Sequence, residues 1–193
     1  MNRRRLILSA AGAGLAVSGV AGTTRGLAAL TATDDELAYA NFGLATEFLL
    51  RDFYTQAAAA KLVGGSAARN LARGRFNAAE HAAALGTLLT GAGQTAAVEE
   101  DFTFVWPDGT FAKADAAATI GLTITQALLG TYLSAVGSIS IASYRTLFAS
   151  MAANLAQQVG ALSELAGGRV VGISFPAALD VQTASDAVAS YLG

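Results

Sequence analysis

Apolar residues recur at intervals of three and four along four long stretches of the chain, and glycines separate these stretches. This spacing places the apolar side chains on one face of an α-helix. The acidic residues Asp34 to Glu36 favour a helix N-terminus, Ser66 can cap a second helix, and Gly167-Gly168 can stop the last one. Four helices are therefore predicted, over about 34–63, 66–90, 112–137 and 140–166.

The connection between the second and third predicted helices is about twenty residues long. Aromatic residues alternate along it and Pro107-Asp108-Gly109 is a typical turn sequence, so an extended strap or a small hairpin is expected. This length allows the third helix to begin at the opposite end of a bundle. After the fourth helix, Thr183 can cap a short final helix to Leu192, and its apolar side chains are expected to close one end of the bundle. The pattern predicts an all-α four-helix bundle with a long crossover between helices 2 and 3.

The third predicted helix carries no charge between Asp115 and Arg145. A membrane span and a helix buried on most of its surface both fit this pattern. Small and polar residues recur on one side of it, which favours a packed helix with a weakly polar face for a partner helix. The residues predicted to face a partner are Thr119, Thr123, Gln126, Gly130 and Ser134, together with Trp106 in the connection.

The first residues have the pattern of an export signal. Arg3-Arg4-Arg5 precede Leu6-Ile7 and an uncharged run to residue 24, which resembles a twin-arginine leader. Cleavage after Ala28 would release a domain of residues 34–193, whereas an uncut leader could anchor it through residues 6–24. The sequence thus predicts export by the twin-arginine route, with the domain periplasmic or attached to the outer face of the cytoplasmic membrane.

Composition narrows the choice of partners. Hydrophobic residues make up 53% of the chain and charged residues 13%, so part of the surface is expected to contact a protein partner or another copy. Without residues 1–28 there remain 8 basic and 14 acidic residues, a net charge of −6 that disfavours nucleic acid. The absence of cysteine excludes disulfides and thiolate chemistry.

Few residues could carry chemistry. His81 is the single histidine, and such a residue is more often a hydrogen-bonded core or surface residue than a metal ligand or a general base. Glu47 lies on an apolar helix face and is expected to pair with Arg51 or Arg75. Trp106 is expected to cover the bundle, with a partner-binding strap as the alternative. A Gly-x-Ser-x-Gly elbow and a phosphate loop are both absent from the sequence.

Several runs resemble the ferritin-like domains of bacterial exported and desiccation-related proteins. The resemblance spans about residues 34–192 and is carried by Asn41 to Glu47 with Phe53-Tyr54, by His81 with Leu85, and by Ser174-Phe175-Pro176 with Leu179-Asp180. It implies a ferritin-like bundle. In that family, carboxylates on two helices and Glu-x-x-His on the other two can hold a pair of iron or manganese ions.

The resemblance places Glu47 at the first carboxylate and His81 at a histidine position. Ala78 stands where the accompanying glutamate would be, and Gln126 and Gln158 are the nearest candidates on the third and fourth helices. The set Glu47, His81, Gln126 and Gln158 therefore forms a degenerate metal site, with iron or manganese as its cofactor if it holds one. The sequence favours a non-catalytic structural or accessory subunit. The alternatives are a residual metal-binding oxidase or storage protein and a free periplasmic or secreted stress protein.

Overall fold

The computed structural model describes residues 32–193, so the predicted leader, residues 1–28, lies outside the described residues. The described part is all-helical, and it contains no β-strand longer than an isolated bridge. Its helices are α1 (Asp34–Ala59), α2 (Gly65–Gly91), α3 (Ala114–Ser138), α4 (Ala142–Leu165) and α5 (Val181–Val188), with two 3₁₀ turns, η2 (Glu99–Asp101) and η3 (Ala189–Tyr191).

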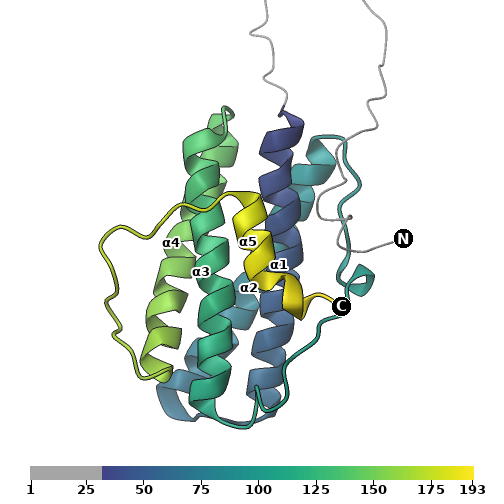
Figure 1. Cartoon of the computed structure of the whole chain (residues 1–193). Coiled ribbons are helices and arrows are strands. Elements are labelled where there is room, and N and C mark those ends of the chain that lie inside the picture. Colours follow the sequence, from purple (N-terminus) through teal and green to yellow (C-terminus); the bar gives the residue numbers. More distant parts are fainter. Residues whose placement is uncertain (1–31) are drawn as a thin grey trace, which may run out of the picture.

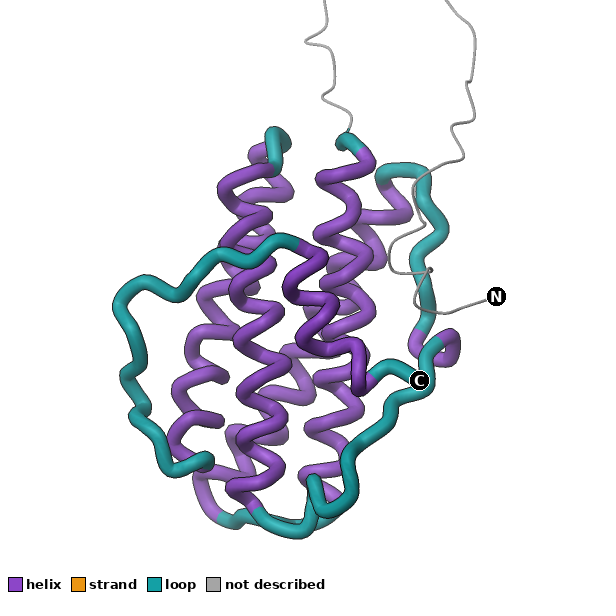
Figure 2. Tube along the Cα trace, viewed as in Figure 1, coloured by secondary structure: helices purple, strands orange, loops and turns teal. Residues whose placement is uncertain are grey.

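The four long helices form a bundle whose neighbours are joined by short turns, except between α2 and α3 (Figure 1). There the chain crosses the full length of the bundle before α3 begins, as Figure 2 shows. Helix α1 packs against α2 and α3, and α4 packs against α3 and α2. The predicted four-helix bundle with a long crossover is confirmed.

The ends of the helices differ from the sequence prediction by a few residues. Helix α1 stops at Ala59, because Lys61 adopts a left-handed conformation with φ 53° that ends the helical path before the glycines. Gly64, and not Ser66, is the N-cap residue of α2. Helix α5 is capped by Asp180, whose Oδ1 accepts the Thr183 amide at 2.8 Å, so the predicted Thr183 cap is wrong. A carboxylate three residues upstream can reach that amide, which explains the change.

The connection before α3 is an extended strap and not a hairpin. Phe104 forms an isolated antiparallel bridge with Leu192, and the amides of Val105 and Gly193 donate to carbonyl oxygens of Tyr191 and Thr103. The strap around Phe104 thus pairs with the C-terminal end of the chain and not with a second strand of its own. This pairing joins the segment that follows α2 to the segment that follows α5.

Helix α5 does not close an end of the bundle, as the sequence suggested. It lies along the side, against α3 and α1 (Figure 1). Its buried residues are Ala184 and Val188, which recur at a spacing of four and so form one narrow apolar face. A short helix with a single apolar stripe can bury that stripe on a groove between two longer helices.

Helix α3 is, among the described helices, the one long and apolar enough to cross a membrane by length and composition. In the bundle it packs against α1, α4 and α5, and its buried residues include Ile124, Leu128 and Tyr132. The uncharged stretch therefore serves as a core helix of the described domain, which is the second of the two readings of the sequence.

Candidate functional site

Glu47 lies at the centre of the bundle on α1. Every residue from Phe42 to Leu50 is buried, so this part of α1 is surrounded on all sides. The Glu47 side chain has no exposed surface. A carboxylate in such a position is costly unless other groups satisfy its oxygens.

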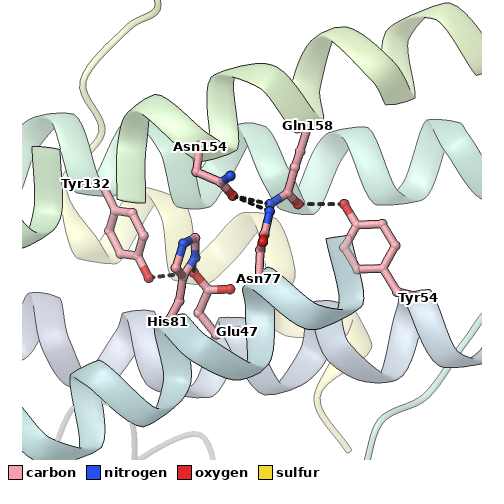
Figure 3. Close-up of polar contacts among 7 residues, drawn as sticks. All are labelled: Glu47, Tyr54, Asn77, His81, Tyr132, Asn154 and Gln158. Carbon is pink, nitrogen blue, oxygen red and sulfur yellow. Dashed lines mark hydrogen bonds and ion pairs between the residues drawn. The ribbon is translucent and has the colours of Figure 1, made fainter. Parts of the chain in front are cut away.

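Two side chains from different helices meet one oxygen of this carboxylate. His81 Nδ1 on α2 lies 2.8 Å from Glu47 Oε1, and the Tyr132 hydroxyl on α3 donates to the same oxygen at 3.0 Å (Figure 3). Gly43, one turn before Glu47, makes room for this approach, because a Cβ there would lie 2.9 Å from the Tyr132 ring. We call Glu47, His81 and Tyr132 the central triad.

Burial shifts the pKa of two members of the central triad, Glu47 and Tyr132. Desolvation raises the pKa of the Glu47 carboxyl above its ordinary 4.5, while the bonds from His81 and Tyr132 act in the opposite direction. Burial also raises the pKa of Tyr132 well above its ordinary 10, and the nearby Glu47 adds to this rise. Tyr132 therefore remains a protonated donor at neutral pH.

The second oxygen of Glu47 stands apart from this network. Oε2 is buried, and it accepts no hydrogen bond from any described residue. An orphaned carboxylate oxygen in a core costs free energy, on the order of 1–3 kcal/mol for a neutral group. Protonation of the carboxyl would reduce this cost, in agreement with the raised pKa.

A second polar network lies beside the central triad and joins α1, α2 and α4 (Figure 3). The Tyr54 hydroxyl donates to Gln158 Oε1 at 2.7 Å, and Gln158 Nε2 donates to Asn154 Oδ1 at 2.7 Å. Asn77 Nδ2 donates to the same Asn154 oxygen at 3.0 Å. We call these four residues the amide network. Burial raises the pKa of Tyr54, so its hydroxyl also stays protonated.

The four predicted metal ligands do not converge. Glu47 and His81 are in contact, as the metal-site hypothesis requires. Gln126 is exposed on the outer face of α3. It lies about 100° around the helix from its neighbour Thr125, which faces inward as Tyr132 does. Gln158 faces inward, but both of its amide atoms are used within the amide network.

The predicted pairing of Glu47 with an arginine is also wrong. Arg51 turns outward, and its guanidinium forms an ion pair and a 3.1 Å hydrogen bond with Glu99 in the connection. Arg75 is exposed on α2. The partners of Glu47 Oε1 are instead the imidazole of His81 and the phenol of Tyr132.

Sequence reasoning missed four residues of this region: Tyr132, Tyr54, Asn77 and Asn154. A signal for two of them exists in the spacing, because Asn77 precedes His81 by four residues and Asn154 precedes Gln158 by four. Residues four apart share a helix face, so each asparagine could have been placed beside a polar residue already singled out. Tyr132 gives no such signal, since a tyrosine in an apolar helix is usually core.

The residues at the centre do not fit a dinuclear metal site. Two divalent cations need several anionic oxygens to balance their charge, and the central triad offers a single carboxylate. Ala78 stands where the glutamate three residues before His81 would be, and Leu155 holds the equivalent position three residues before Gln158; both are fully buried. Within residues 32–193 no group of three or more His, Cys, Asp or Glu side chains could hold a metal ion.

The predicted partner-facing residues of α3 are exposed in its first half and covered by other parts of the domain in its second half. Thr119, Thr123 and Gln126 are exposed on α3. Gly130 is buried beneath the segment before α5: its carbonyl accepts the Leu179 amide at 2.9 Å, and a Cβ there would lie 2.6 Å from the Leu179 side chain. Ser134 is half-buried beside the Tyr39 hydroxyl at 3.2 Å. The segment before α5 thus covers Gly130, and Tyr39 of α1 contacts Ser134.

Trp106 faces the bundle and not the solvent. Its ring packs against Phe53, Phe111 and Tyr191, and its Nε1 donates to Asp52 Oδ2 at 2.7 Å. The aromatic side chains of the strap thereby cover α1 at this level. This arrangement is the covering role that the sequence favoured for Trp106.

A family model described as a ferritin-like domain matches residues 35–168, which is more than half of the chain and covers all four long helices. Comparison with curated proteins finds no match.

Proposed function

The chain belongs to the ferritin-like domain family, and on that premise we propose that it is a non-catalytic member in which hydrogen bonds between side chains have replaced the metal pair. In this proposal the domain is an exported structural or accessory subunit of a cell-envelope complex. Its centre stabilises the fold and does not transfer electrons.

The observation that carries the proposal is the set of hydrogen bonds made to the Glu47 carboxylate. One oxygen of the carboxylate is taken by His81 and Tyr132, at 2.8 and 3.0 Å. Both partners come from helices other than α1, so the triad joins α1, α2 and α3 across the core. This arrangement supports a packing role, because a buried polar network with one main acceptor fixes the register of the helices that contribute to it.

The accessory role is supported by a surface that the domain leaves uncovered. Val171, Ile173 and Phe175 in the segment between α4 and α5 are 83%, 75% and 91% exposed. Apolar side chains gathered at such exposure are typical of a contact with another macromolecule. Export rests on the twin-arginine pattern of residues 1–28, and the low charge of the domain is consistent with a partner in the envelope.

Metal analysis of the protein tests the non-catalytic proposal. The full chain is purified from its own cell envelope and, separately, exposed anaerobically to Fe(II) and Mn(II) before desalting. The proposal predicts well below one tightly bound metal ion per chain in both samples. About two iron or manganese ions per chain, with the spectroscopic signature of a coupled pair, would overturn it.

One observation favours a second candidate function. The buried Oε2 of Glu47 has no partner among the described residues, and such an atom is a potential ligand for a single cation held together with the imidazole of His81. A residual metal-binding oxidase or storage protein would use these two residues. It predicts one Mn(II) per chain by electron paramagnetic resonance, lost in Glu47→Gln, whereas the first proposal predicts that the variant and the parent protein bind equally little.

A further inference from the structure

A groove of about 450 Å³ opens between α2 and α4, to one side of the central triad. Glu47, His81 and Tyr132 do not line it. The two helices run in opposite directions (Figure 1), so the start of α2 lies beside the end of α4. One end of the groove is therefore lined by Asn77, Asn154 and Gln158, and the other by Leu71, Leu162 and Leu165. This volume lies within the usual range of small-molecule sites, about 300–1,000 Å³.

The polar end of the groove offers mainly hydrogen-bond donors. Within the amide network, the Gln158 carbonyl oxygen accepts from Tyr54, and the Asn154 carbonyl oxygen accepts from both Gln158 and Asn77. A primary amide carries two N–H groups, so Asn154 keeps both of its donors, and Asn77 and Gln158 each keep one. A ligand that meets this end needs acceptor oxygens.

A positive charge stands beside these donors. Arg73 is an exposed lining residue between the two ends, and its guanidinium lies 5.3 Å from the centre of the Phe76 ring. It forms no ion pair with any described residue, and the residues that line the groove include no Asp or Glu. An unpaired guanidinium beside amide donors is suited to a carboxylate, which it can bind through two parallel hydrogen bonds.

The other end of the groove is mainly apolar, with the exposed Asn70 beside Leu71, and it continues into the bundle. Leu71, Leu162 and Leu165 also line a small cavity whose other walls include Phe53 and Ala57. Tyr54 and Gly74 form the floor of the groove between its two ends. They are in close contact, because a Cβ on Gly74 would lie 2.6 Å from the Tyr54 ring. An aliphatic chain placed along this floor would lose its contact with water and gain apolar contacts.

We propose that this groove binds a small aliphatic carboxylate, with the carboxylate at Arg73 and the amide donors and the aliphatic chain along the leucines. Asn154 and Leu165 are eleven residues apart on α4, which corresponds to about 16 Å along the helix axis. A medium-length chain fits this length. The site lies outside the central triad, so the proposal holds whether or not a metal binds there.

Titration with sodium octanoate tests the proposal on the full chain. Binding is followed by nuclear magnetic resonance of the side-chain amides of Asn77, Asn154 and Gln158, of the leucine methyl groups, and of the exposed side chains of Val171, Ile173 and Phe175. The expected result is saturable shifts at both ends of the groove. Arg73→Ala should weaken binding at least about tenfold. Arg75→Ala is the matched control, because this exposed arginine lies two residues away on α2 and does not line the groove, and it should bind as the parent protein does.

Comparison with 1-octanol needs no variant and separates the carboxylate from the chain. The proposal predicts that octanol binds at least about tenfold more weakly than octanoate. Equal binding of the two, or equal binding by Arg73→Ala and Arg75→Ala, would overturn it. So would shifts confined to the exposed residues Val171, Ile173 and Phe175, or an absence of shifts at about 10 mM octanoate.

Discussion

His81 Nδ1 on α2 lies 2.8 Å from Glu47 Oε1 on α1, so the single histidine of the chain is joined to the carboxylate at the bundle centre. In a ferritin-like bundle the same two residue types would serve as ligands. Here their contact with each other, together with the Tyr132 hydroxyl, satisfies one carboxylate oxygen without a cation.

Glu47→Ala and Glu47→Gln should differ strongly in stability. Alanine leaves His81 and Tyr132 without their acceptor and opens a cavity in the core, which should cost about 3 kcal/mol of unfolding free energy. Glutamine keeps an acceptor oxygen and removes a charge that is costly to bury, so its effect should stay within about 1 kcal/mol. Urea denaturation of both variants measures the difference. Equal losses would show that the negative charge itself is needed.

The raised pKa of Glu47 predicts a pH dependence of stability. Because the folded state holds the proton more tightly than the unfolded state, this carboxyl contributes stability that is fully present below pH 4.5. The contribution is lost as pH rises through the raised pKa of the folded state. The glutamine of Glu47→Gln cannot titrate. The unfolding free energy of this variant should therefore rise relative to that of the parent protein as pH increases from 4.5. A difference that stays constant or shrinks over this range would contradict the raised pKa.

Two glycines of α2 should respond in opposite ways to alanine. A Cβ on Gly74 would lie 2.6 Å from the ring of Tyr54, whereas a Cβ on Gly86 would meet its nearest neighbour at 3.9 Å. Gly74→Ala must displace a buried phenol and should destabilise by about 1–3 kcal/mol. Gly86→Ala should stabilise by up to about 1 kcal/mol, because alanine is the better helix former. Thermal unfolding of the pair checks this, and a stabilised Gly74→Ala would contradict the described packing of Tyr54.

Trp106 is the single tryptophan of the chain and reports on the strap. Asp52→Asn should weaken the 2.7 Å bond to Trp106 Nε1, because it removes the charge of the acceptor. The fluorescence of Trp106 should then move toward that of an exposed indole, with a loss of about 1 kcal/mol in unfolding free energy. Asp108→Asn, a change at an exposed residue of the same strap, is the control and should leave both unchanged. An unchanged spectrum in Asp52→Asn would show that the bond to Asp52 is not needed to hold the Trp106 ring in place.

The fold could be predicted from the sequence because the apolar periodicity of such long helices is visible within each stretch of the chain. Apolar spacing and glycine breakers placed four helices, and the length of the connection predicted the crossover. Helix ends were less accurate, since the stop at Lys61 and the cap by Asp180 depend on the conformation of single residues.

The site could be predicted only in part. Resemblance to ferritin-like helices singled out Glu47 and His81, which do meet. Gln126 is exposed and does not reach Glu47, because a polar residue on an apolar helix can face either the core or solvent, and a rotation of about 100° decides between them. The role of Gly130 could not be predicted, because its neighbour Leu179 lies 49 residues away and reaches it only in the folded chain.

The most direct test of the central claim is the unfolding free energy of the full chain in Mn(II) compared with that in chelator. A metal that binds only the folded state adds stability, about 2.7 kcal/mol when its concentration is a hundred times its dissociation constant. Our account of the triad predicts the same unfolding free energy in both solutions, within about 0.5 kcal/mol. A gain of 2 kcal/mol or more in Mn(II), absent in Glu47→Gln, would show that the bundle centre is a metal site after all, on the order expected for a bound ligand.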